Sequence, residues 1–147
     1  MITREVFKML IDKAKHQADY SCSGLQLAKI LSLFLNSEML FSWYVFDTQN
    51  PSFNSPVDYY ENTPLLMDKV SKVEQFMSGV FIAVKAGDDV NWNERHLPVT
   101  EEDEGIQHEK AILEIRAFDT TYFEVYSFNK RVIEKICTDN IEILKQC

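Results

Sequence analysis

The densest group of chemically active side chains in this sequence lies between Asp88 and Glu109. This segment holds eight acidic residues and one basic residue, Arg95, so its formal charge of −7 accounts for most of the −8 of the whole chain. Carboxylates at such density have two chemical uses, since they bind a hard cation such as Ca²⁺ or face a basic protein surface. The acids are Asp88, Asp89, Glu94, Glu101, Glu102, Asp103, Glu104 and Glu109.

The spacing of these acids favours a protein partner over a metal ion. An EF-hand loop alternates its ligands around an internal glycine, and the run from Glu101 to Glu104 has neither feature. An aromatic side chain beside the acids, Trp92, can anchor an interface while carboxylates speed and orient the encounter. The segment is therefore either a solvated charged loop or a surface for a basic partner. The partner-binding residues that we predict are Asp88, Asp89, Trp92, Glu94, Glu101, Glu102, Asp103 and Glu104.

Other reactive residue types in the chain form no recognisable motif. Glycine occurs only at 24, 79, 87 and 105, so neither GxGxxG nor GxxxxGK[ST] is present. The three histidines lie outside the spacings of zinc sites, and there is no GxSxG. We predict no catalytic, cofactor-binding or metal-binding residue. The alternative is a small enzyme whose site is assembled from scattered residues such as Asp88, Glu94 and His96, which spacing does not reveal.

Composition narrows the class of protein further. A chain of 147 residues with 46% hydrophobic and 12% aromatic content is globular and fits a single domain spanning 1–147. The net charge of −8 disfavours nucleic acid and anionic membranes as partners and favours a basic protein. Three cysteines without CxxC spacing indicate a reducing compartment. The first ten residues lack a signal-peptide core, and the apolar run Leu25 to Leu35 is too short to span a bilayer, so we expect a cytoplasmic protein.

The clearest structural element is a β-hairpin between Ala111 and Phe128, AILEIRAFDTTYFEVYSF. Its alternation fits a register in which paired residue numbers sum to 240, which places the apolar side chains on one face. Asp119 at the turn is expected to take a left-handed conformation. The opposite face, around Arg116, Tyr122, Glu124 and Tyr126, is a second candidate surface for a partner. The predicted pairs are Ile115 with Val125, Ala117 with Phe123, Arg116 with Glu124, and Phe118 with Tyr122.

The remaining periodicities predict an α+β fold with a sheet of about four strands, mixed or antiparallel, that ends in this hairpin and is packed by helices. Strands are expected at Leu40 to Phe46 and Val80 to Lys85, and Trp43 should be buried. A parallel pairing of these two strands is possible because a helix lies between them, and an antiparallel pairing is the alternative. The predicted helices run from Thr3 to Ala18, Leu25 to Leu35 and Pro64 to Met77, and from Asn129 through Ile136 towards Leu144.

This layout resembles a group of small bacterial proteins. The Phe41-Ser42-Trp43 strand and the EIRAFDTTYFEVY hairpin followed by a helix are similar to immunity proteins of contact-dependent growth inhibition and related toxin systems, and to small bacterial families of uncharacterised function. The resemblance covers Leu40 to Cys137. It implies a non-enzymatic toxin inhibitor that acts by protein-protein contact, commonly against a nuclease with a basic cleft. A regulatory adaptor module is the further alternative, and it differs mainly in the identity of its partner.

Overall fold

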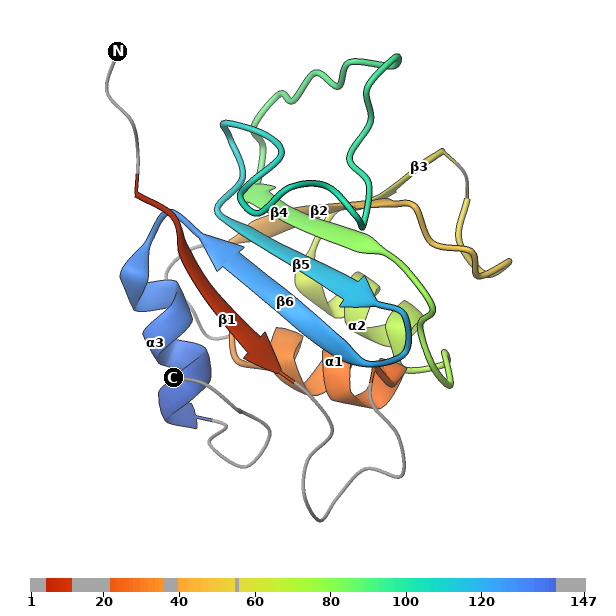
Figure 1. Cartoon of the computed structure of the whole chain (residues 1–147), viewed down its shortest axis with the longest axis horizontal. Coiled ribbons are helices and arrows are strands. Elements are labelled where there is room, and N and C mark those ends of the chain that lie inside the picture. The colour runs from red at the N-terminus through yellow and green to blue at the C-terminus, as the bar shows by residue number, and fades with distance from the viewer. Residues whose placement is uncertain (1–4, 12–21, 36–39, 55, 140–147) are drawn as a thin grey trace.

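The computed structural model describes residues 5–11, 22–35, 40–54 and 56–139. All strands in these ranges join one antiparallel sheet of six strands in the order β1-β6-β5-β4-β2-β3 (Figure 1). The strands are β1 Phe7–Ile11, β2 Phe41–Phe46, β3 Val57–Tyr60, β4 Val80–Lys85, β5 Leu113–Phe118 and β6 Tyr122–Ser127. The helices are α1 Gly24–Ser32, α2 Thr63–Val70 and α3 Lys130–Asp139.

In Figure 1, α1 and α2 lie behind the sheet and α3 lies beside β1, and all three helices contribute to the main core. Trp43 on β2 is fully buried in this core, as the sequence predicts. Its indole Nε1 donates a hydrogen bond of 3.0 Å to Thr63 Oγ1 at the start of α2. That bond satisfies the polar atom of a large buried aromatic ring, so the ring's apolar area is buried without an orphaned donor.

The hairpin forms in the predicted register. Ile115 pairs with Val125 and Arg116 with Glu124, so the residue numbers sum to 240 throughout. The prediction that Asp119 is left-handed is confirmed, since its φ is 45°, and Thr120 follows with a φ of 61°. Two consecutive residues with positive φ form the tight turn whose twist matches that of the strands it joins.

The sheet has six strands, not about four, and one of the unforeseen strands is β1. The predicted helix from Thr3 to Ala18 is wrong at Phe7–Ile11, and the rest of that prediction falls largely outside the described residues. β1 pairs with the free edge of β6, and Met9 and Ile11 point into the core from alternate positions. Over only five residues the apolar pattern fits a helix and a strand equally well, and the pairing with β6 decides for the strand.

The second unforeseen strand, β3, also decides the direction of its neighbours. β3 and β4 flank β2, and both run antiparallel to it, so of the two pairings of β2 with β4 that the sequence left open the structure has the antiparallel one. β3 and β4 are therefore parallel to each other, and α2 is the crossover between them. β3 spans four residues at a sheet edge and is only partly buried, which leaves little hydrophobic alternation to detect.

The helix ends follow local capping chemistry. α2 is shorter than the predicted Pro64 to Met77, and its N-cap is Asn62, whose side chain accepts a hydrogen bond from Leu65 N. α1 approaches α2 closely at Gly24, whose backbone N donates to Val73 O at 3.0 Å. In α3 the predicted cap is confirmed, because Asn129 Oδ1 accepts from Arg131 N. The predicted extension of α3 towards Leu144 lies beyond the described part of the chain.

Candidate functional site

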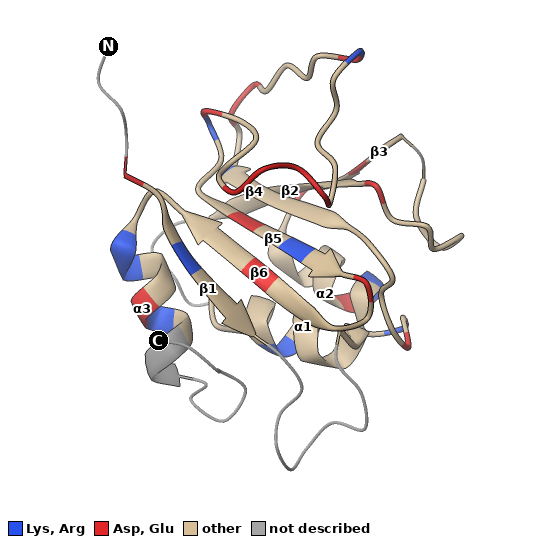
Figure 2. Cartoon of the chain, viewed as in Figure 1, with Lys and Arg blue, Asp and Glu red and all other residues tan. Residues whose placement is uncertain are grey.

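The acidic segment lies on the face of the sheet opposite the helices. The connection from β4 to β5, residues 86–112, forms an irregular loop that crosses this face (Figures 1 and 2), and we call it the acidic loop. Beneath it the sheet is divided into two halves. β2 and β4 supply an apolar half through Phe46, Val80, Ile82 and Val84. β1, β5 and β6 supply a charged half through Lys8, Glu114, Arg116, Glu124 and Tyr126.

Trp92 holds the acidic loop on the apolar half. Its ring centroid lies 4.6 Å from that of Phe46 and 5.2 Å from that of Tyr44, in edge-on geometry. The centroid of the His108 ring, from the returning part of the loop, also lies 4.6 Å from that of the indole. Val90, Leu97 and Ile106 pack around the same small core. The half-buried indole is therefore an internal anchor that fastens both limbs of the loop to the sheet.

Arg116 on β5 holds the acidic loop on the charged half. Its side chain is fully buried, and its guanidinium donates to three backbone carbonyls of the loop, at 2.8 Å to Glu102 O, 3.2 Å to Asp103 O and 2.6 Å to Gly105 O. Its Nε donates to Glu114 Oε2 at 2.7 Å, and its Cζ lies 4.6 Å from the ring centroid of Tyr126. The planar guanidinium thus supplies hydrogen bonds to backbone carbonyls in the most acidic part of the chain.

Glu114 extends this anchor to the next turn of the loop. Its carboxylate is fully buried and accepts from the backbone N of Gln107 at 2.8 Å and from Gln107 Nε2 at 2.9 Å. The Gln107 amide also bridges the two limbs, because it accepts from Val99 N at 3.0 Å and donates to Val99 O at 3.1 Å. The loop is therefore closed on itself by the same side chain that ties it to β5.

A third anchor, Thr100, fixes the loop at the start of β4. Thr100 is buried, and its backbone N donates to Asp47 Oδ2 at 2.8 Å. Its hydroxyl accepts a hydrogen bond of 2.9 Å from Gly79 N. Asp47 stands in a left-handed conformation with a φ of 56°, directly after β2. Contacts at three separate places therefore hold the backbone of the loop in position, although the loop contains no helix or strand.

Lys8 on β1 completes the charged half at its outer edge. Its ammonium forms ion pairs with Glu104 of the loop and, at 3.2 Å, with Glu124 of β6. Burial opposes the charge on Lys8, but its hydrogen bonds to Glu104 and Glu124 raise its pKa above the ordinary lysine value, and the same ion pair lowers the pKa of Glu104. Burial and a 2.8 Å hydrogen bond to Glu124 raise the pKa of Tyr126.

The predicted partner-binding residues divide into two groups in this arrangement. Trp92, Glu102 and Glu104 make internal contacts, since Glu102 accepts from the backbone N of Asp103 and Glu104 pairs with Lys8. The remaining acids project into solvent, and within the described residues their side chains have no hydrogen-bond or ion-pair partner. This second group is Asp88, Asp89, Glu94, Glu101 and Asp103.

The second candidate surface, on the outer side of the hairpin, is not available to a partner as predicted. Arg116, Glu124 and Tyr126 are buried, Arg116 in contact with the acidic loop, and Tyr122 is partly buried. Sequence reasoning also missed the residues that fix the loop. The sequence does contain one indication of them. Charged side chains at alternate positions of two central strands need hydrogen-bond partners when their face of the sheet is buried, and a segment that covers this face must supply those partners.

Within the ranges that the structure describes, no group of His, Cys, Asp and Glu side chains is placed to hold a metal ion. No helix in the same ranges is long and apolar enough to cross a membrane. The scattered residues of the enzyme alternative, Asp88, Glu94 and His96, are all exposed, and no side-chain hydrogen bond joins them. Comparisons of the chain with protein-family models, curated proteins and solved structures found no match.

Proposed function

We propose that this chain is an inhibitor of the toxin-immunity type, which binds a basic toxin domain through its acidic loop and blocks the toxin's working surface. One observation carries the proposal. The side chains of Asp88, Asp89, Glu94, Glu101 and Asp103 are exposed and form no ion pair with the described residues, while the backbone that bears them is tied to the sheet by Trp92, Thr100 and Arg116.

A fixed acidic loop suits rapid recognition of a basic surface. Carboxylates that outnumber the nearby cations generate a negative potential that extends about a Debye length, roughly 8–10 Å, and steers a basic partner into place. Because the loop backbone is held before binding, association does not have to order it. Nuclease toxins present basic clefts to their substrate phosphates, so an array of carboxylates can occupy the same cleft in place of nucleic acid.

The division of the acids defines the experiment. We expect the triple variant Glu94→Gln, Glu101→Gln, Asp103→Asn to associate with its basic toxin domain about tenfold more slowly at low salt and to lose most of its salt dependence, because exposed charges act mainly on the encounter rate. The dissociation rate should change little. The proposal predicts a toxin-encoding reading frame beside this chain's gene, and the toxin domain of that frame is the partner to be used. The measurement is surface-based binding kinetics at two salt concentrations.

A matched control separates the loop from net charge. The triple variant Glu5→Gln, Asp68→Asn, Glu134→Gln removes the same charge from exposed positions outside the loop. It should associate nearly as fast as the unaltered chain. Equal slowing in both variants would assign the effect to net charge alone, and unaltered rates in the loop variant would refute the proposed function.

A further inference from the structure

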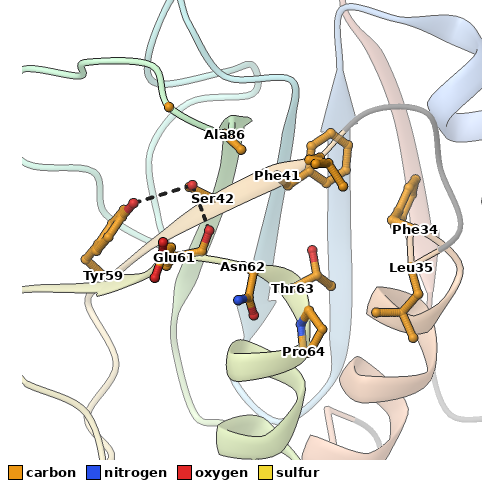
Figure 3. Close-up of a pocket in the computed structure, with 12 residues that line it drawn as sticks. Phe34, Leu35, Phe41, Ser42, Tyr59, Glu61, Asn62, Thr63, Pro64 and Ala86 are labelled. Carbon is orange, nitrogen blue, oxygen red and sulfur yellow. Dashed lines mark hydrogen bonds between the residues drawn. The ribbon is translucent and has the colours of Figure 1, made fainter.

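A pocket of about 480 Å³ opens at one end of the sheet, between the end of α1 and the start of α2 (Figure 3). Phe34 and Leu35 form its wall on the α1 side, and Pro64 forms the wall on the α2 side. Leu40 and Phe41, at the start of β2, also line it. This pocket is separate from the acidic loop's contacts with the sheet, although Ala86 and Gly87, the first two residues of the loop, are among its lining residues.

The pocket combines apolar walls with a negative rim. Among the described residues that line it, Glu61 is the one that carries a charge, and none of them is a lysine, arginine or histidine. The Glu61 residue is exposed, and its carboxylate has no ion-pair or hydrogen-bond partner in the described part of the chain. Beyond the rim, the chain continues from Gly87 directly into the exposed Asp88 and Asp89. An unpaired carboxylate above apolar walls is complementary to a side chain with an aliphatic stem and a cationic end.

The start of α2 does not offer this pocket the donors that an anion would need. A helix N-terminus binds anions through backbone N–H groups that lack partners. In α2 the N–H groups of Leu65 and Leu66 are already used, since Leu65 N donates to Asn62 Oδ1 at 2.9 Å and Leu66 N donates to Asn62 O. Pro64 has no N–H at all. The pocket therefore favours a cation in spite of the helix end on its wall.

Tyr59 provides a fixed aromatic surface at the pocket mouth. Its ring is about half exposed, with a relative accessibility of 51%, and its inner side packs on Tyr44 with centroids 5.0 Å apart. The hydroxyl of Tyr59 donates to Ser42 Oγ at 3.4 Å, and Ser42 in turn donates to the carbonyl of Glu61 (Figure 3). These bonds connect the tyrosine to the segment that carries the carboxylate. A cation over such a ring gains a cation–π interaction in addition to the ion pair.

We infer that this pocket receives a lysine or arginine side chain of a protein partner, with its stem against Leu40 and Pro64 and its charged end between Glu61 and the Tyr59 ring. The inference rests on the proposed function only in taking the partner to be a basic protein. It adds a second contact that acts differently from the acidic loop. The loop speeds the encounter, whereas a seated side chain slows dissociation.

The direct test uses a small probe and the full chain. N-acetyl-arginine amide is titrated into the labelled protein and followed by NMR, with N-acetyl-citrulline amide as a probe of nearly the same shape without charge. We expect saturable shifts of the amides of Tyr59, Glu61 and Gly87 with the arginine probe and none with citrulline. Equal shifts with both probes, or shifts confined to other regions, would overturn the inference.

Variants sharpen this test. Glu61→Gln should weaken the arginine probe about fivefold, which corresponds to about 1 kcal/mol for a partly exposed ion pair. Glu134→Gln on α3 is the control and should bind the probe unchanged; an unchanged affinity in Glu61→Gln would also overturn the inference. The loop triple variant at Glu94, Glu101 and Asp103 separates the two proposals. If the loop variant binds the probe normally and no variant alters toxin binding, the proposed function alone fails. If the loop variant slows toxin association but the unaltered chain does not bind the arginine probe, the inference about the pocket alone fails.

Discussion

Replacing Arg116 with methionine is the most direct perturbation of the acidic loop. Methionine keeps the unbranched apolar stem of the side chain and removes all of its donors. The variant loses the 2.7 Å ion pair with Glu114 and the hydrogen bonds to the backbone carbonyls of Glu102, Asp103 and Gly105. Because Arg116 and Glu114 are both fully buried, the carboxylate is left without its cation inside the protein.

The expected cost follows from this burial. Removing one partner of a buried ion pair costs about 3–5 kcal/mol. Glu114 keeps its two hydrogen bonds from Gln107, and the freed carbonyls of the loop are near enough to the surface to meet water, so the lower end applies. We expect Arg116→Met to lower the free energy of unfolding by about 3 kcal/mol, a large part of the roughly 5–15 kcal/mol of a typical domain. Adding Glu114→Gln should recover about 1–2 kcal/mol, because it removes the stranded charge.

Two measurements check this reasoning. Urea unfolding followed by tryptophan fluorescence gives the free energies, and native-state hydrogen exchange at the amides of Thr100 and Gln107 reports whether the loop is loosened. Lys72→Met is the control, since its ion pair with Asp68 is solvent-exposed and should contribute no more than about 0.5 kcal/mol. The role of Arg116 as the loop's anchor would be refuted if Arg116→Met lowered the free energy of unfolding by less than about 1 kcal/mol and left hydrogen exchange at both amides unaltered.

Further predictions concern the core and the alkaline range. Gly24→Ala should destabilise the fold by about 3 kcal/mol in urea unfolding, because a Cβ there would overlap the carbonyl oxygen of Val70; an unchanged midpoint would contradict this close approach. Thr63→Val should cost about 1–3 kcal/mol by leaving the buried indole N–H of Trp43 without an acceptor, whereas Thr63→Ser should cost less. Since the pKa of Tyr126 is raised by folding, its phenol ionises first in the unfolded chain, and stability should fall as pH rises above about 10. Tyr126→Phe should flatten that fall between about pH 10 and 11, and an equally steep fall would contradict the assignment.

Local patterns in the sequence were sufficient to predict the elements whose stabilising contacts are close together in the chain. The hairpin of β5 and β6 is predictable to the residue, because its partners are near in sequence and Asp119 can take the turn conformation. α1 and the start of α3 follow from helical periodicity and from the cap at Asn129. β1 is different, because its five residues become a strand only through the free edge that β6 presents.

The acidic loop likewise has features that the sequence predicts and features that only the tertiary structure decides. Its charge, its length and its lack of regular structure are all properties of composition, so the sequence alone determined that a concentrated set of carboxylates occurs at 88–109. Which carboxylates are paired and where the loop backbone lies were decided by contacts between distant segments, such as Lys8 with Glu104 and Asp47 with Thr100. The burial of Arg116 likewise depends on the loop folding back over β5. Hydrogen bonds across such separations depend on where the sheet places each segment in space, and no periodicity along the chain encodes that placement.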